Sequence, residues 1–179
     1  MKTVFFDIDS QRDFLYPAGA LYVPNAERIV PAIAHLNRFA AAHGIPVVST
    51  VDAHAENDPE FAVWPPHCVA GTWGQRKAQA TLVDSASQII VEKQTVDVFL
   101  SPDLVRVVER LNADRYVVYG VVTEICVLSA VRGLLKTGQP VTVVTDAVEA
   151  LTAEASARAL EEVRAGGGTL ATLSEICRM

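Results

Sequence analysis

Gly120-Val121-Val122-Thr123-Glu124-Ile125-Cys126 is the stretch that decides the fold, because it joins a short apolar run to a segment of helical period. The run at 116–119 predicts a buried strand, and the apolar residues after the stretch recur at three- and four-residue steps, as on one face of a helix. We expect Thr123 to cap this helix, which places Cys126 in its first turn. Free backbone N–H groups and the helix dipole favour a thiolate there. Cys126 is therefore a candidate nucleophile, although an unpaired cysteine is more often a small core residue.

The whole-chain composition favours a small-molecule partner. Residues 1–179 are enough for one domain with a continuous core, and we expect a single domain. The net charge of −6 argues against nucleic acid or an anionic membrane as the main partner. No apolar run approaches the roughly 20 residues that span a bilayer, and no secretory leader follows Met1. The three cysteines, an odd count without close spacing, predict a cytoplasmic location.

Strand-like apolar runs alternate with helical segments along the chain. Strands are predicted at 4–8, 45–51, 89–91, 116–119, 141–145 and 169–173, with helices between them. The alternation predicts right-handed crossovers and a three-layer α/β/α fold, with a mostly parallel sheet of about six strands and helices on both faces. In such a fold, functional groups collect beyond the carboxyl ends of the strands.

Three residues at predicted strand ends carry complementary chemistry: Asp9, Lys93 and Cys126. A cysteine hydrolase needs a thiolate, a group that moves protons and donors for the oxyanion. These side chains and the backbone N–H groups of 122–126 supply such a set. Singly, Asp9 is as easily a turn residue and Lys93 a solvated strand end.

The densest set of metal-capable side chains follows the second predicted strand: Asp52, His54, Glu60 and His67. Asp52 and His54 are two residues apart, close enough to bind one ion. His67 and Glu60 complete a mixed nitrogen and oxygen set. The alternative is a polar loop with two surface histidines.

Four motifs in this order resemble those of the isochorismatase-like cysteine hydrolases, and most closely the nicotinamidases. They are D-x-Q-x-D-F at 9–14, D-x-H at 52–54, W-P-x-H-C-x-x-G-T at 64–72 and G-x-x-T-[DE]-x-C at 120–126. The resemblance covers nearly the whole chain, and it implies the isochorismatase-like hydrolase fold.

The resemblance also implies the roles of individual residues. It implies a catalytic triad of Asp9, Lys93 and Cys126, a cis peptide bond between Val121 and Val122, and an oxyanion hole made by the N–H groups of Val122 and Cys126. It further implies that Phe14 and Trp64 wall the substrate ring, and that Asp52, His54 and His67 hold one divalent metal ion. We expect zinc, with manganese or iron as alternatives, because this ligand set suits all three.

A fourth metal ligand is predicted from spacing and charge. Glu60 lies between His54 and His67 in the loop that both anchor, and with Asp52 it would cancel the charge of a divalent ion. It would replace a histidine found in many relatives. Asp58 and Glu56 are the rivals.

The predicted function is conversion of nicotinamide and water to nicotinate and ammonia through a thioester on Cys126, a step of pyridine nucleotide biosynthesis. Residues 94–99 depart from the usual Y-S-x-F run of the family, so the substrate could be another small amide or a vinyl ether. A non-catalytic binding or scaffold protein of the same fold is a third possibility. We also expect a homo-oligomer. Asp7, in place of a usually apolar strand residue, has no explanation in the sequence.

Overall fold

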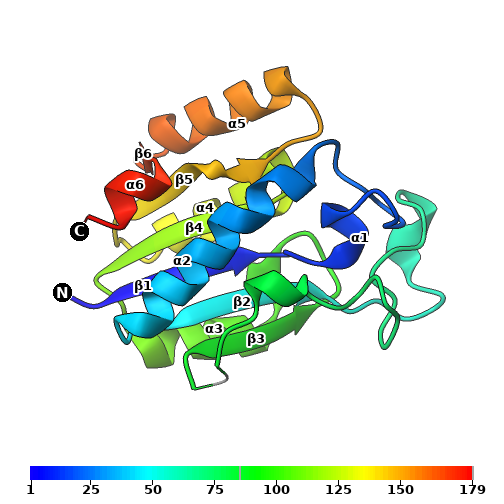
Figure 1. The fold of residues 1–179 in the computed structure, drawn as a ribbon, viewed down its shortest axis with the longest axis horizontal. Helices are drawn as coiled ribbons and strands as arrows, with labels where there is room; N and C mark the ends of the chain where they lie inside the picture. The colour runs from blue at the N-terminus through cyan, green and yellow to red at the C-terminus, as the bar shows by residue number, and fades with distance from the viewer. Residues whose placement is uncertain (85, 179) are drawn as a thin grey trace.

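The six strands of the computed structural model, which describes residues 1–84 and 86–178, are all parallel and form one sheet in the order β3-β2-β1-β4-β5-β6. The strands are β1 (Thr3–Ile8), β2 (Val47–Asp52), β3 (Gln88–Lys93), β4 (Arg115–Val121), β5 (Val141–Glu149) and β6 (Thr169–Ala171). They cross the middle of the molecule (Figure 1). Every residue of β1 and β2 is buried, which is typical of parallel strands covered on both faces.

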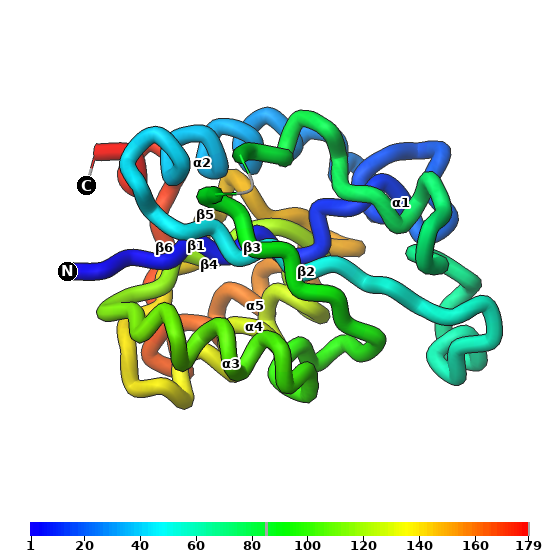
Figure 2. The backbone as a smooth tube through the Cα atoms, turned by 90° about the horizontal axis from the view of Figure 1, so that it is seen from below, coloured from blue at the N-terminus to red at the C-terminus, as the bar shows by residue number. Residues whose placement is uncertain are grey.

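Helices cover both faces of the sheet. They are α1 (Arg12–Leu15), α2 (Val30–Ala42), α3 (Pro102–Leu111), α4 (Leu128–Leu135), α5 (Ala153–Ala165) and α6 (Leu173–Ile176). Helices α2 and α6 lie on one face, and α3, α4 and α5 lie on the other (Figure 2). This arrangement confirms the predicted three-layer α/β/α fold.

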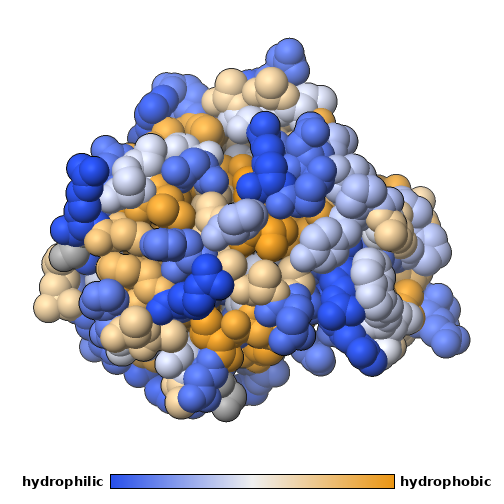
Figure 3. Space-filling view, in the orientation of Figure 1, coloured by the Kyte–Doolittle hydropathy of each residue, from blue (hydrophilic) through white to orange (hydrophobic). Residues whose placement is uncertain are grey.

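Short helical turns complete the described chain: η1 (Ala26–Ile29), η2 (Pro59–Ala62), η3 (Gln79–Thr81), η4 (Val98–Leu100) and the π-helical turn η5 (Thr123–Val127). Within residues 1–84 and 86–178, no helix has the length and apolar character needed to cross a membrane. On the face that carries α2, hydrophilic side chains break up the apolar areas of the surface (Figure 3).

The helix start after β4 differs from the prediction. Val122, not Thr123, is the N-cap residue, and the Thr123 hydroxyl is buried without a hydrogen-bond partner. The carbonyl of Val122 accepts hydrogen bonds from the N–H groups of Ile125 and Val127, each at 3.1 Å. The second of these bonds spans five residues, so the chain enters α4 through a π-helical turn.

The strand ends also differ from the prediction by one to four residues, and the structure explains two of these differences. The last strand ends at Ala171 rather than at 173, because Thr172 and Glu175 form a capping box that starts α6. Strand β5 continues to Glu149, because a register shift between Val118 and Gly120 lets it pair again with the end of β4.

Asp7 is explained by a buried ion pair on the α2 face of β1. The Lys77 ammonium lies 2.8 Å from Asp7 Oδ2 and donates to the Ser10 hydroxyl at 2.5 Å. Asn37, on α2, donates to the same carboxylate oxygen at 2.8 Å. A charge on a central strand is tolerated here because it is paired and hydrogen-bonded. The pair also fixes the loop that carries Lys77 against the segment after β1.

Candidate active site

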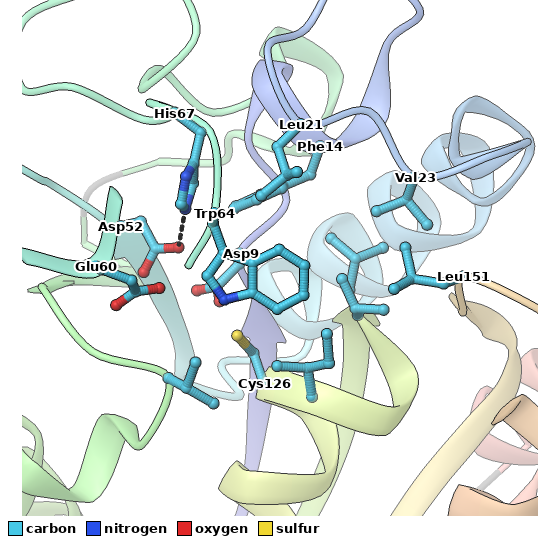
Figure 4. Close-up of a pocket in the computed structure, with 14 residues that line it drawn as sticks. Asp9, Phe14, Leu21, Val23, Asp52, Glu60, Trp64, His67, Cys126 and Leu151 are labelled. Carbon is cyan, nitrogen blue, oxygen red and sulfur yellow. Dashed lines mark ion pairs between the residues drawn. The ribbon is translucent and has the colours of Figure 1, made fainter. Parts of the chain in front are cut away.

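A pocket of about 460 Å3, partly open to solvent, lies at the carboxyl ends of the central strands. Its lining is divided by polarity (Figure 4). Polar side chains lie on one side, aliphatic ones on the opposite side and Cys126 between them; the polar set is Asp52, Glu60 and His67, and the aliphatic set is Leu21, Val23 and Leu151.

Asp9, Lys93 and Cys126 come together at the base of this site, where Asp9 and Cys126 line the pocket. The Lys93 ammonium lies 2.9 Å from Asp9 Oδ2 and 3.8 Å from Cys126 Sγ. Each residue is less than 9% exposed, so the three groups meet where water screens their charges little. Asp9 follows β1 in a left-handed conformation (φ +48°), and Thr50 donates to its other oxygen at 2.6 Å. The sequence-predicted trio is thus assembled from the ends of β1, β3 and β4.

Burial governs the protonation of this trio. It raises the pKa of the Cys126 thiol well above its usual range, although the positive charge of Lys93 opposes the rise. Burial likewise raises the pKa of Asp9, again against Lys93. Burial alone would lower the pKa of Lys93, but the negative charges of Asp9, Cys126 and Asp52 raise it well above its usual range. Burial therefore favours the neutral thiol form of Cys126 and increases the affinity of the neighbouring Asp9 carboxylate for a proton.

Asp52 connects two parts of the site. Its Oδ1 is ion-paired with Lys93, and its Oδ2 faces Nε2 of His54 at 3.8 Å and Nε2 of His67 at 3.9 Å. The sequence prediction treated Asp52 as a metal ligand alone and missed its pairing with Lys93. The two residues end neighbouring strands in register, so the sheet topology was the signal that could have found this pair.

Asp52, His54 and His67 form a group that fits a divalent metal ion. One ligand atom from each lies within 4.8 Å of the others, and all three residues are buried. His54 Nδ1 is held by Asp58 Oδ2 at 3.0 Å, and His67 Nδ1 by the carbonyl of Pro65 at 2.8 Å. Each Nδ1 thus carries the proton, and each Nε2 turns its lone pair toward Asp52. His54 Nε2 is buried without a hydrogen-bond partner, as expected of an atom placed to bind a metal.

The electrostatics of His54 reflect the acidic groups around it. Burial alone would lower its pKa, but the adjacent carboxylates of Asp52 and Asp58 raise it to about 9. The site therefore attracts positive charge strongly, whether a proton or a metal ion.

Glu60 lies at the same pocket but outside the three-residue group. It belongs to η2, which Asp58 caps, and its side chain lines the pocket. Burial raises the pKa of its carboxyl group. Asp58 already accepts hydrogen bonds from His54 and from the Glu60 N–H, and Glu56 is exposed. Of the three acidic candidates, Glu60 remains the one available as a fourth ligand, and its role stays a prediction.

Aromatic rings surround the metal-binding group. Phe14 lies with its ring centre 5.5 Å from that of His67, and Trp64 lines the pocket beside Cys126 (Figure 4). Phe61 packs on both histidines, at 5.4 Å from His54 and 5.7 Å from His67. Sequence reasoning missed Phe61, and its position between the D-x-H and W-P-x-H-C motifs was the only signal for it.

The turn that carries Cys126 has the backbone that the family resemblance implies. The peptide bond between Val121 and Val122 is cis, and both Val122 and Cys126 line the pocket. Gly120 has a φ of +121°, and a Cβ atom there would lie 2.0 Å from the carbonyl oxygen of Ile8. This position therefore requires glycine.

Fold and pocket together define an α/β/α protein whose cysteine, lysine and carboxylate meet at the carboxyl edge of a parallel sheet. The isochorismatase domain matches residues 3–175. The chain belongs to the isochorismatase family, which confirms the predicted resemblance and the prediction of a hydrolase of this family.

Similar proteins include two nicotinamidases. Nicotinamidase of Escherichia coli is 27% identical, with 94% of this chain and 93% of that protein covered. Nicotinamidase/pyrazinamidase of Mycobacterium tuberculosis is 29% identical, with 88% and 91% covered. Among solved structures, the pyrazinamidase of Pyrococcus horikoshii in complex with zinc superimposes with a TM-score of 0.89 at 30% identity, covering 96% of this chain and 99% of that one.

Proposed function

We propose that this protein is a metal-containing cysteine amidohydrolase that converts nicotinamide and water to nicotinate and ammonia. The observation that carries the proposal is the contact of Lys93 with both Asp9 and Cys126, beside the buried group of Asp52, His54 and His67. The names of the E. coli and M. tuberculosis relatives support the same substrate.

Proton transfer in the proposed reaction runs between Cys126 and Asp9, which contact one another. Asp9 takes the thiol proton as the sulfur attacks the carboxamide carbon and the C–S bond forms. The N–H groups of Val122 and Cys126 would stabilise the oxyanion. The C–N bond then breaks, and Asp9 gives its proton to the leaving amine, which departs as ammonia.

Water completes the cycle by attacking the thioester. Asp9 accepts a proton from this water, nicotinate leaves, and the proton returns to the Cys126 sulfur. Lys93 remains positively charged throughout, because its pKa is raised well above its usual range. Its charge therefore stabilises both the thiolate and the carboxylate as they form.

The divided pocket suits an aromatic ring with one polar edge. Phe14 and Trp64 would pack on the faces of the ring, and the aliphatic side chains would cover the edge that carries no heteroatom. A divalent ion held by Asp52, His54 and His67, with Glu60 as the proposed fourth ligand, would supply a Lewis acid for the pyridine nitrogen. We propose zinc, with manganese or iron as the alternatives. The free cysteines support a cytoplasmic location.

Ammonia release from nicotinamide by the purified protein tests this function. We expect turnover of nicotinamide and slow turnover of benzamide, which has the same shape but lacks the ring nitrogen. Equal rates for the two amides would contradict metal anchoring of the ring. If the protein prefers another small amide, the cysteine mechanism stands and only the proposed substrate is wrong. If it hydrolyses a vinyl ether instead, the cysteine mechanism is also wrong, because that reaction does not need the thiol. No turnover of any of these compounds would support the binding or scaffold alternative.

The Cys126→Ala variant isolates the nucleophile. We expect it to lose ammonia release while it keeps its fold, because alanine fits the turn and removes only the sulfur. Cys177→Ala is the matched control, since Cys177 lies outside the pocket and should be dispensable. Ammonia release by Cys126→Ala at the wild-type rate would overturn the assignment.

A further inference from the structure

Gln11 is completely buried at the point where β1 leaves the sheet. The last register pair of β1 with β2 joins Ile8 and Thr50, and the left-handed Asp9 then turns the chain away. Strand β2 continues to Asp52 and stays paired with β3 on its other side, where Asp52 is in register with Lys93. The side of Asp52 that faces β1 therefore has no strand residue beside it.

The side chain of Gln11 occupies the place of that missing strand residue. Its Oε1 accepts a hydrogen bond from the Asp52 N–H at 2.7 Å, and its Nε2 donates to the Asp52 carbonyl at 2.8 Å. A residue of a parallel strand directs its N–H and C=O to the same neighbour, and a carboxamide presents the same donor and acceptor as a peptide group. Nε2 also donates to the carbonyl of Gln75 at 2.6 Å. Only one orientation of the amide satisfies all three bonds.

We propose that Gln11 is a positioning residue for the metal site, which holds the backbone of Asp52 so that its two carboxylate oxygens stay divided. This inference rests on the proposed metal-dependent function. Oδ1 is committed to Lys93, and Oδ2 faces the Nε2 atoms of His54 and His67. Rotation of the Asp52 backbone would move both carboxylate oxygens of its side chain away from their partners. Holding the backbone therefore keeps Oδ1 on Lys93 and Oδ2 facing the two histidines.

The chain contains a matched control in Gln88. This glutamine is also buried, and its side chain also makes three hydrogen bonds: from the Val83 N–H at 3.0 Å, to the Ser49 hydroxyl at 2.8 Å and to the Thr81 carbonyl at 3.2 Å. It begins β3, whereas Lys93 ends that strand. Five residue steps separate the two, which is roughly 16 Å along a strand. Loss of the Gln88 amide therefore removes comparable bonds far from the metal site.

The test is the zinc dissociation constant of the full chain, measured by competition with a chelator on protein shown to be folded by circular dichroism. We expect Gln11→Met to weaken zinc binding by about 10- to 100-fold, as for other residues that orient metal ligands. Gln88→Met should lower the unfolding temperature but leave zinc affinity within about twofold of the wild type. Gln11→Asn keeps the amide on a side chain that is one methylene shorter, so it should weaken zinc binding less than Gln11→Met does. If Gln11→Met does not fold, the zinc affinity of Gln11→Asn provides the test.

Wild-type zinc affinity in both Gln11 variants would overturn the inference, and so would an equal loss in Gln88→Met, which would indicate a general structural effect. A wild-type protein that binds no zinc would overturn both this inference and the metal part of the proposed function. A wild-type protein whose tight zinc binding is weakened in the Gln11 variants, but which releases no ammonia from nicotinamide, would overturn the proposed reaction alone.

Discussion

At the scale of single residues, Cys126 is acted on by two opposing effects. Burial disfavours the thiolate, and the nearby Lys93 ammonium favours it. The sequence prediction emphasised the helix terminus and the cation, both of which lower a thiol pKa. In the structure, burial raises the pKa of the thiol despite the cation, so the proposed mechanism uses Asp9 as a proton acceptor for the thiol.

Removing Lys93 should shift the reactivity of Cys126 to higher pH. In Lys93→Met the pKa of Cys126 rises further, because the opposing positive charge is lost. Iodoacetamide labelling of Cys126, followed peptide by peptide in a mass spectrometer, should then begin at a higher pH than in the wild type. Turnover should also fall about 100-fold or more. Lys136→Met, at an exposed position, is the control, and a labelling profile identical to wild type in Lys93→Met would contradict the interaction.

Glu60 and Glu56 provide a matched test of the fourth ligand. Both are glutamates of the same loop, but only Glu60 lines the pocket. Glu60→Gln should lower the zinc retained after dialysis against a chelator, because a neutral amide is a weaker ligand than a carboxylate. Glu56→Gln should retain zinc like the wild type. If both variants keep the wild-type metal content, the site has three protein ligands: Asp52, His54 and His67.

At the scale of elements, the end of β4 is shaped by its contact with β1. Gly120 is in register with Ile8, and its backbone lies against the Ile8 carbonyl with no room for a Cβ atom. Together with the π-helical turn that follows, this close approach sets where Cys126 stands above the sheet.

Gly120→Ala should therefore destabilise the fold well beyond the cost of a positive φ. Replacing a glycine at a positive φ by alanine lowers the free energy of unfolding by about 1–2 kcal/mol. Here the added methyl group would also lie 2.0 Å from the Ile8 carbonyl oxygen. We expect a loss of at least about 3 kcal/mol in urea unfolding. Gly138 also has a positive φ, of +80°, and a Cβ atom there would meet no atom within 4 Å, so Gly138→Ala should lose only about 1–2 kcal/mol. Equal losses in the two variants would contradict the steric argument.

At the scale of the whole molecule, a buried ion pair joins parts of the chain that are 70 residues apart. Asp7 on β1 and Lys77 in the loop before η3 are both nearly inaccessible to water. Because Lys77 also contacts Ser10, beside Asp9, the pair connects this loop to the segment that carries the proposed proton shuttle.

Breaking this pair on one side should cost more than replacing both partners. Lys77→Met leaves the Asp7 charge buried and unpaired, for an expected loss of about 3–5 kcal/mol in urea unfolding. The double variant Asp7→Asn with Lys77→Met should recover part of that loss, because a neutral amide needs no counter-charge and can still bond to Asn37 and Ser49. A double variant less stable than Lys77→Met would contradict this account.

The expected single domain and homo-oligomer stay predictions.

The sequence by itself determined the layers of the fold and the edge of the sheet at which chemistry gathers. Hydrophobic periodicity is a local property, so it predicted about six strands with helices between them, and their alternation predicted a mostly parallel sheet. The connection rules of such sheets then placed Asp9, Lys93 and Cys126 beyond the carboxyl ends of strands, at one edge of the sheet. The motifs extended this prediction to Asp52, His54 and His67, and the family match confirmed the resemblance that supplied them.

Only the tertiary structure decided how these groups are paired and oriented. The bond of Gln11 to Asp52 spans 41 residues and that of Lys77 to Asp7 spans 70, and neither leaves a periodic trace in the sequence. The hydrogen bond between Asp58 and His54 depends on the path of the loop that carries both residues. The ion pair between Asp52 and Lys93 depends on the register of β2 and β3. The protonation of Cys126 depends on its burial, because the free energy of removing a charge from water is set by the whole surrounding structure rather than by neighbouring residues in the chain.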